Sequence, residues 1–175
     1  MSGLLGRLFG GVPKDFTGTL EREEAVAAWA PERGGGVLLA SSLGLWVPTD
    51  DGPRRIGWHL VSKATWASGV FVITEAEEVE RAGEAVLLAD RAPLRFVVER
   101  PGKLPQAVQR RVTGSIRTRH RRDLPDGGAW FVQRKVPGRD GTVLQVRPDP
   151  GTDVDLVREI AQEVARRMGE GLAEG

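Results

Sequence analysis

Short apolar runs separated by polar breaks fill the first half of the chain. Between residues 36 and 75 these runs occupy positions 37–40, 43–47, 56–61, 64–66 and 70–73. Each run is only long enough for a strand that crosses a small barrel, and the breaks contain the Gly, Pro, Asp and Ser residues of tight turns. The pattern predicts consecutive antiparallel strands, with a first strand at 25–30 and later ones at 85–89 and 94–98. The acidic stretch 75–84 between them is expected to be an exposed strand edge or a loop.

The hydrophobic period changes after residue 101. Apolar residues then recur every four positions, which predicts an amphipathic helix with Pro105 in its first turn: Leu104, Val108, Val112 and Ile116. Alternation returns at 116–124, and strands starting at 129 and 142 complete a predicted three-stranded meander. Thr152 and Asp155 have the spacing of a helix N-cap. They precede a final helix whose apolar face contains Val154, Val157, Ile160, Val164 and Met168.

The order of these strands resembles the first half of a bacterial pleckstrin-homology-like (PH-like) domain. The resemblance rests on a strand ending in Leu45-Trp46-Val47, a basic break, a segment Trp58-His59-X-Val61-X-X-Ala64, and a turn at Gly69. It covers about residues 20 to 116 and implies an α+β fold, a small antiparallel barrel closed by one helix. We therefore expect a flexible tail at 1–18, the barrel at 19–116, and the meander with its helix at 117–175, packed on the barrel. Such barrels carry unrelated ligands and partners, so the resemblance implies no particular activity.

Composition narrows the classes of chemistry. The 175 residues contain no Cys and two His, so disulfides and thiol catalysis are impossible, and neither a metal site nor a cofactor is expected. Four of the 25 basic residues are Lys and the other 21 are Arg, a bias typical of a GC-rich, actinobacterial-type genome. The absence of Cys fits a cytoplasmic protein, and no apolar stretch is long enough to cross a membrane. The apolar positions of residues 1–12 suggest a tail that docks on the core, with peripheral membrane contact as the alternative.

The net charge is only +1, so any anion-binding function must rest on a local cluster of basic residues. No acid occurs between Glu99 and Asp123. If 116–124 is a strand, Arg117, Arg119 and Arg121 share one face at a spacing of roughly 7 Å, which suits successive phosphates. The candidate anion-binding residues are Arg110, Arg111, Arg117, Arg119, Arg121 and Arg122. The favoured alternative is a solvated face whose arginines pair with the acids of 75–84 or with the final helix.

Five Trp and no Tyr are an unusual choice of aromatic residues. The first four lie in apolar strand patterns and are predicted to fill the core: Trp29, Trp46, Trp58 and Trp66. Trp130 is equally consistent with a core position and with an exposed ring beside the arginines.

His59 is expected to be a hydrogen-bonded strand residue. An enzyme that uses it as a general base, oriented by Asp50 or Asp51, is kept as a minor alternative. No nucleophile motif, phosphate-binding loop or paired catalytic carboxylates are recognisable, so the first expectation is a non-catalytic protein.

Together these observations predict a cytoplasmic binding or adaptor module that acts through association with another protein or with itself. Its candidate contact residues are Trp130, Val157, Ile160 and Val164. The alternative is an anion-binding protein that uses the Arg117 to Arg122 strand, with nucleic acid ahead of phospholipid.

Overall fold

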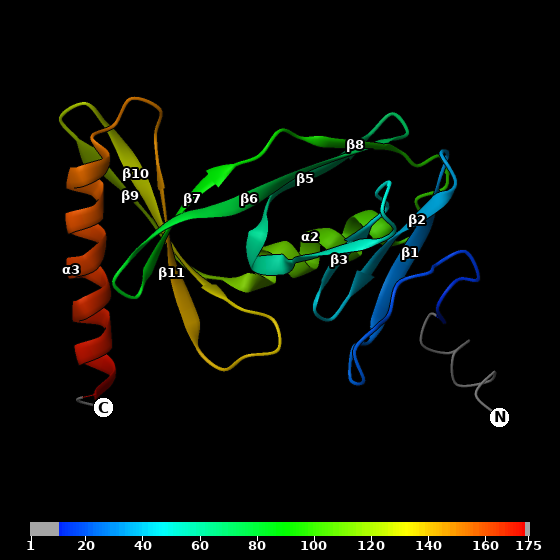
Figure 1. Cartoon of the computed structure of the whole chain (residues 1–175), viewed down its shortest axis with the longest axis horizontal. Coiled ribbons are helices and arrows are strands. Elements are labelled where there is room, and N and C mark those ends of the chain that lie inside the picture. The colour runs from blue at the N-terminus through cyan, green and yellow to red at the C-terminus, as the bar shows by residue number, and fades with distance from the viewer. Residues whose placement is uncertain (1–10, 174–175) are drawn as a thin grey trace. The chain divides into compact units, whose positions relative to one another are not determined.

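The computed structural model describes residues 11–173, and the chain is α+β. It divides into two compact units (Figure 1). Within the described residues, the first unit comprises residues 11–75 and 92–114, and the second comprises residues 76–91 and 115–173. This division differs from the expected ranges 19–116 and 117–175, because residues 76–91 and residues 115 and 116 belong to the second unit.

Antiparallel strands and one helix build the first unit. Four strands follow one another in the order β1-β2-β3-β4, namely β1 (Val26–Glu32), β2 (Gly36–Ser41), β3 (Gly44–Val47) and β4 (Arg54–Gly57). After a 3-10 turn (Trp58–Leu60), β5 (Val61–Ala67) and β8 (Leu94–Val97) pair with opposite edges of β6 (Val70–Ala82). The helix α2 (Leu104–Ser115) follows. The strands predicted from the apolar runs are therefore present, except that the run 56–61 is interrupted by the 3-10 turn.

A single hydrophobic cluster joins both groups of strands to α2. Leu38 and Leu45 from the four-stranded sheet and Phe71 from β6 lie in it with Leu104 and Val108 of the helix, and all five are at most 1% exposed. The four-residue spacing of the apolar positions in α2 thus marks its buried side, as predicted. On the other side of the four-stranded sheet, Phe16 is buried in an edge-to-face contact with Trp46, with the two ring centroids 5.3 Å apart. The predicted tail at 1–18 therefore includes a core residue, while residues 1–10 lie outside the described part.

The second unit is a sheet covered by a helix on one face. Residues 76–82 of β6 pair antiparallel with β7 (Ala85–Asp90), β7 pairs parallel with β11 (Thr142–Pro148), and β10 (Gly127–Lys135) lies between β11 and β9 (Ile116–Leu124). The helix α3 (Val154–Ala173) packs on the sheet through Val157, Ala161 and Ala165, which lie in one buried cluster with Phe131 and Val146. The predicted meander and the final helix are confirmed.

The acidic stretch 75–84 agrees with one of its two predicted alternatives, an exposed strand edge, because residues 76–82 of β6 pair with β7 alone among the described strands. The segment 56–61 differs from its prediction. The stretch 75–84 is mostly regular strand, since β6 continues to Ala82 before a turn at Gly83, whose φ of 63° suits glycine. The run 56–61 is not one strand, because a 3-10 turn occupies Trp58–Leu60.

The predicted N-cap of the last helix is wrong by one residue. The Oδ1 atom of Asp153 accepts the N–H groups of Asp155 and Leu156, so Asp153 caps α3. The Thr152 hydroxyl donates instead to the carbonyl of Gly128, at 3.2 Å.

The prediction of a core position is wrong for two of the four tryptophans. Trp46 and Trp58 are buried, whereas Trp29 and Trp66 are each 39% exposed. Trp29 lies on β1, the terminal strand of the four-stranded sheet. The indole N–H of Trp66 donates to the carbonyl of Val98 at 3.2 Å.

Candidate binding face on strand β9

Strand β9 lies at the end of the ladder of the second unit and pairs with β10 alone among the described strands. Seven consecutive residues, 117–123, are exposed. They include four Arg and His120 against the single acid Asp123. The sheet therefore ends in an accessible strand with a strongly basic sequence.

The pairing register sorts the basic side chains onto the two faces of the sheet. His120 pairs with Phe131 on the face that α3 covers, whereas Arg119 and Arg121 pair with Val132 and Trp130 on the opposite face. A register shift between Gln133 and Arg134 leaves Arg117 as the extra residue of a bulge. The expected regular row of Arg117, Arg119 and Arg121 on one face therefore holds for the last two.

Trp130 lies beneath two guanidinium groups. The guanidinium carbon of Arg119 is 4.1 Å from the centroid of the Trp130 ring, and that of Arg121 is 5.7 Å away. Trp130 is half-buried, and its π face attracts both cations. Because Arg119 already stacks on the ring, Trp130 holds an arginine in position rather than offering a free face to a nucleobase.

Arg121 is fixed by acids of its own unit. Its Nη1 donates to Asp149 Oδ1 at 2.9 Å, its Nη2 contacts Asp149 Oδ2, and its Nε lies 3.4 Å from Asp123. The hydrogen bonds with Asp149 raise the pKa of Arg121 and lower that of the Asp149 carboxyl. Two of its donors are thus engaged before any ligand arrives.

Arg119 and Arg122 differ from Arg121 in having no ion pair among the described residues. The acids of β6 that were expected to neutralise the basic strand pair elsewhere: Glu77 with Arg91, Glu78 with Arg81, and Glu80 with Arg158. Arg119 and Arg122 therefore keep donors for an anionic partner. Arg110 and Arg111 are exposed on α2 in the first unit, so they are considered separately from β9.

The backbone of β9 alternates between bonds to β10 and groups at the open edge. On β10, the Gly128 carbonyl accepts the N–H of Asp149 at 2.9 Å, and the Gly128 N–H donates to Thr152 at 3.3 Å. Both groups of Gly128 thus point away from β9, and in an antiparallel sheet the backbone groups of Trp130 and Val132 do the same. The residues of β9 opposite these three are Asp123, Arg121 and Arg119. Their N–H and C=O groups therefore do not bond to β10 and point to the open edge.

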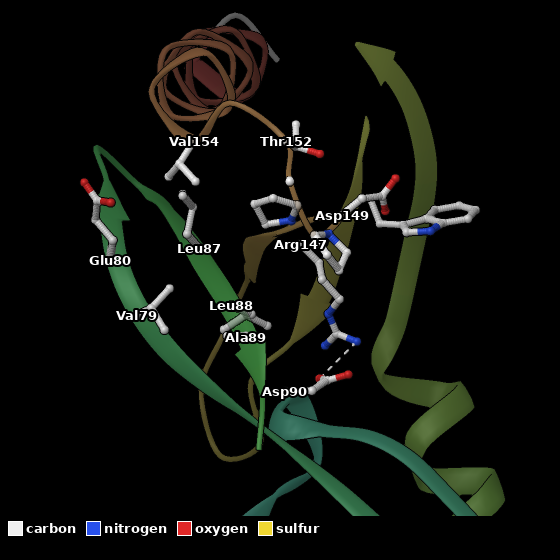
Figure 2. Close-up of a pocket in the computed structure, with 14 residues that line it drawn as sticks. Val79, Glu80, Leu87, Leu88, Ala89, Asp90, Arg147, Asp149, Thr152 and Val154 are labelled. Carbon is white, nitrogen blue, oxygen red and sulfur yellow. Dashed lines mark ion pairs between the residues drawn. The ribbon is translucent and has the colours of Figure 1, made fainter. Parts of the chain in front are cut away.

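A cleft of about 590 Å³ lies beside Trp130 at the carboxyl ends of β7 and β11 (Figure 2). Val79, Leu87 and Leu88 give it an apolar lining, and Arg147 is paired with Asp90 at 3.3 Å. The other charged lining residues are Glu80 and Asp149, and both are also ion-paired within the unit. The cleft offers apolar surface without an uncompensated charge, so we place the candidate site on β9.

The apolar side of α3 is used inside its own unit. Val157 is fully buried in the cluster, and Ile160 and Val164 are partly buried against it. Of the four candidate contact residues, only Trp130 is next to the basic strand: it lies on β10, on the sheet face that carries Arg119 and Arg121.

His59 lies in the 3-10 turn of the first unit. The turn that holds Asp50 and Asp51 is closed by hydrogen bonds between Thr49 and Gly52.

Searches of the described residues give no group of three or more His, Asp or Glu that could hold a metal ion. In residues 11–173, no helix has the length and apolar character needed to span a membrane. Comparisons of the chain with protein-family models, with curated proteins and with solved structures give no match.

Proposed function

We propose that this chain is a non-catalytic protein-binding module, and that the open edge of β9 receives an extended segment of a partner protein as an added strand. The observation that carries the proposal is the orientation of the β9 backbone, which directs the N–H and C=O groups of Arg119, Arg121 and Asp123 outward. An added strand gains main-chain hydrogen bonds from such an edge, and the neighbouring side chains provide specificity. A cytoplasmic adaptor of a bacterial cell is the setting that this proposal assumes.

The proposal includes a PH-like scaffold for the first unit. The proposal is supported by the chain order of the first unit, which has a four-stranded sheet, three further strands and then a helix. Residues 76–91 then form an excursion between β6 and β8 that belongs to the second unit with β9. In this view the first unit is the scaffold and the second unit carries the binding edge.

Binding of single-stranded nucleic acid is the second candidate function. It is favoured by one observation, that Arg119 and Arg122 have no ion pair among the described residues. Phosphates would satisfy these donors without any main-chain pairing, and affinity would fall steeply with salt. The stack of Arg119 on Trp130 counts against a base-stacking role for that ring.

The test uses a matched pair of variants that leave every arginine in place. Asp123→Pro removes an outward N–H, whereas Asp123→Ala keeps it and serves as the control. An edge strand tolerates proline where the lost N–H faces solvent, so both variants are expected to fold. The probes are nine-residue peptides of sequence Thr-Val-Glu-Thr-Val-Glu-Thr-Val-Thr, with versions in which both Glu are Gln or Lys, and a 20-nucleotide poly-U strand.

Strand addition predicts that at least one peptide protects the amides of Arg119, Arg121 and Asp123 from hydrogen exchange. It also predicts that Asp123→Pro lowers the affinity for this peptide about tenfold or more, because one main-chain hydrogen bond is lost and the adjacent one is disturbed. Asp123→Ala should not lower this affinity. The absence of amide protection with all three peptides would overturn the proposal. Binding of poly-U that is equal in both variants would establish the second candidate in its place.

A further inference from the structure

The charges on β9 also indicate which kind of strand it receives. We infer that the partner segment is acidic, with two carboxylates three residues apart, one opposite Arg119 and one opposite Arg122. This inference rests on the proposed function, because it assumes that the partner pairs with the edge of β9.

The spacing follows from which arginines are available. Arg121 is held by Asp149, while Arg119 and Arg122 have no ion pair among the residues that the structure describes. Arg119 and Arg122 are three positions apart, so their side chains lie on opposite faces of the sheet. Residues directly opposite them in an added strand are also three apart, and this spacing is the same for parallel and antiparallel addition.

Arg119 is the better organised of the two contacts. Its guanidinium is held over the Trp130 ring at 4.1 Å, which restricts the side chain before a ligand binds. A planar guanidinium that is already positioned loses less conformational freedom when it binds a carboxylate. The carboxylate opposite Arg119 is therefore expected to contribute more affinity than the one opposite Arg122.

Asp123 limits the acidic part of the partner. It is 87% exposed and lies at the end of the basic run, next to the hairpin turn. A carboxylate placed opposite Asp123 would be repelled, because like charges on directly opposed residues destabilise a sheet. The partner is thus acidic over the stretch that faces residues 119–122 and neutral or basic beyond it.

A second copy of the chain does not satisfy these charges. Pairing β9 with its own copy through residues 117–122 would set arginines and His120 against the same basic residues. Charged side chains on an edge strand oppose such self-association. The same arginines that exclude a second copy accept an acidic segment, so the charge pattern selects between these two occupants.

The experiment measures affinity of the full chain for designed peptides by fluorescence anisotropy. The two-Glu peptide is expected to bind about tenfold more tightly than its Gln version, as two solvent-exposed charge pairs allow. A peptide with the two Glu only two residues apart, on one face, is expected to bind more weakly than the first. Arg119→Glu should weaken binding of the two-Glu peptide at least tenfold, and this peptide should lose most of its advantage over the version with two Lys.

Arg110→Glu is the matched control, because it makes the same change of charge on α2 in the first unit. If it weakens the two-Glu peptide as much as Arg119→Glu does, the inference fails, since general electrostatic attraction explains the binding. The inference also fails if the Glu, Gln and Lys peptides bind equally while Asp123→Pro still weakens them, an outcome that leaves the proposed function intact. If no peptide binds at all, the arginines only protect the edge from self-association, and both proposals are overturned.

Discussion

The two units each contain an arginine stacked on a tryptophan, and the surroundings of the two pairs differ. In the first unit the guanidinium carbon of Arg55 is 5.5 Å from the centroid of the Trp46 ring, and Arg55 also bonds to Glu24 and Glu21 at 2.7 Å. In the second unit Arg119 stacks on Trp130 without an acid partner among the described residues. The same residue pair thus belongs to a closed network in one unit and to an accessible surface in the other.

Glu24 is the residue that closes the first network. Its side chain has no solvent-accessible surface, and it accepts hydrogen bonds from the Ser41 hydroxyl at 2.5 Å, the Trp46 indole at 2.9 Å and the Glu21 N–H at 2.9 Å. Burial alone would raise its pKa, but these hydrogen bonds and the charge of Arg55 together lower it. Arginine next to tryptophan is therefore structural where a buried acid satisfies it and available for binding where no acid does.

Removing Glu24 is the largest expected perturbation. Glu24→Ala leaves the Trp46 indole N–H and one side of Arg55 without the acceptor that Glu24 provides, while the Ser41 hydroxyl keeps its longer bond to the Gly44 carbonyl, at 3.2 Å. The unpaired groups are expected to lower the free energy of unfolding by roughly 3 kcal/mol. This value is at the lower end of the range for breaking a buried ion pair, because Arg55 is partly exposed. Urea unfolding followed by the Trp46 indole resonance measures the loss. The neighbouring exposed variant Glu23→Ala should change stability by less than about 0.5 kcal/mol, and an equal loss in both variants would mean that the network does not stabilise the unit.

Acid should weaken the first unit through the same residue. The pKa of Glu24 is lower in the folded protein than its ordinary value of 4.5, so its contribution to stability is complete above pH 4.5. That contribution is lost as the pH falls from 4.5 through the lower, folded-state pKa. Glu24→Gln cannot titrate, and its unfolding free energy should therefore depend less on pH below 4.5 than that of the parent chain. Parallel pH profiles of the two proteins would contradict this assignment.

The sequence predicted the strands and helices better than the environments of their side chains. The four-residue period of α2 and the alternation at 116–124 are local properties, and β9 has the expected bounds. The helix α2 covers Leu104–Ser115, so Ile116, which was expected on its apolar face, instead begins β9. The exposure of Trp29 and Trp66 was not predictable, because an apolar pattern does not show which strand ends a sheet.

The candidate site was likewise predicted only in part. The basic strand was visible as a run of residues without acids between Glu99 and Asp123. Three features of this strand depend on tertiary structure: its pairing with β10, the bulge at Arg117, and the ion pair of Arg121 with Asp149, which lies 28 residues later in the chain. The availability of Arg119 therefore required the structure, since charge along the sequence does not show which arginines are already paired.

Replacing the ring of the second pair should have a smaller effect than opening the first network. Trp130→Leu keeps an apolar side chain on β10 but removes the π face beneath Arg119 and Arg121. The loss is expected to be about 1 kcal/mol, the value of an exposed cation–π contact together with some lost apolar area. Urea unfolding of the second unit measures it, with the exposed variant Val79→Ala as a control on the same sheet. A loss as large as that of Glu24→Ala would show that the second pair is also structural.

The smallest effect on stability is expected for Asp149→Asn, which releases Arg121 while preserving the size of the side chain. Both partners are about one-third exposed, and solvent screens such pairs, so the urea midpoint should hardly move. Binding should respond more than folding does, because a third arginine on β9 then becomes available beside Arg119. The two-Glu peptide should bind a few-fold more tightly to this variant, whereas the Gln peptide should be unaffected. If both peptides gain equally, the release of Arg121 has changed the shape of the edge rather than its charge, and the contrast between paired and available arginines would no longer explain what β9 binds.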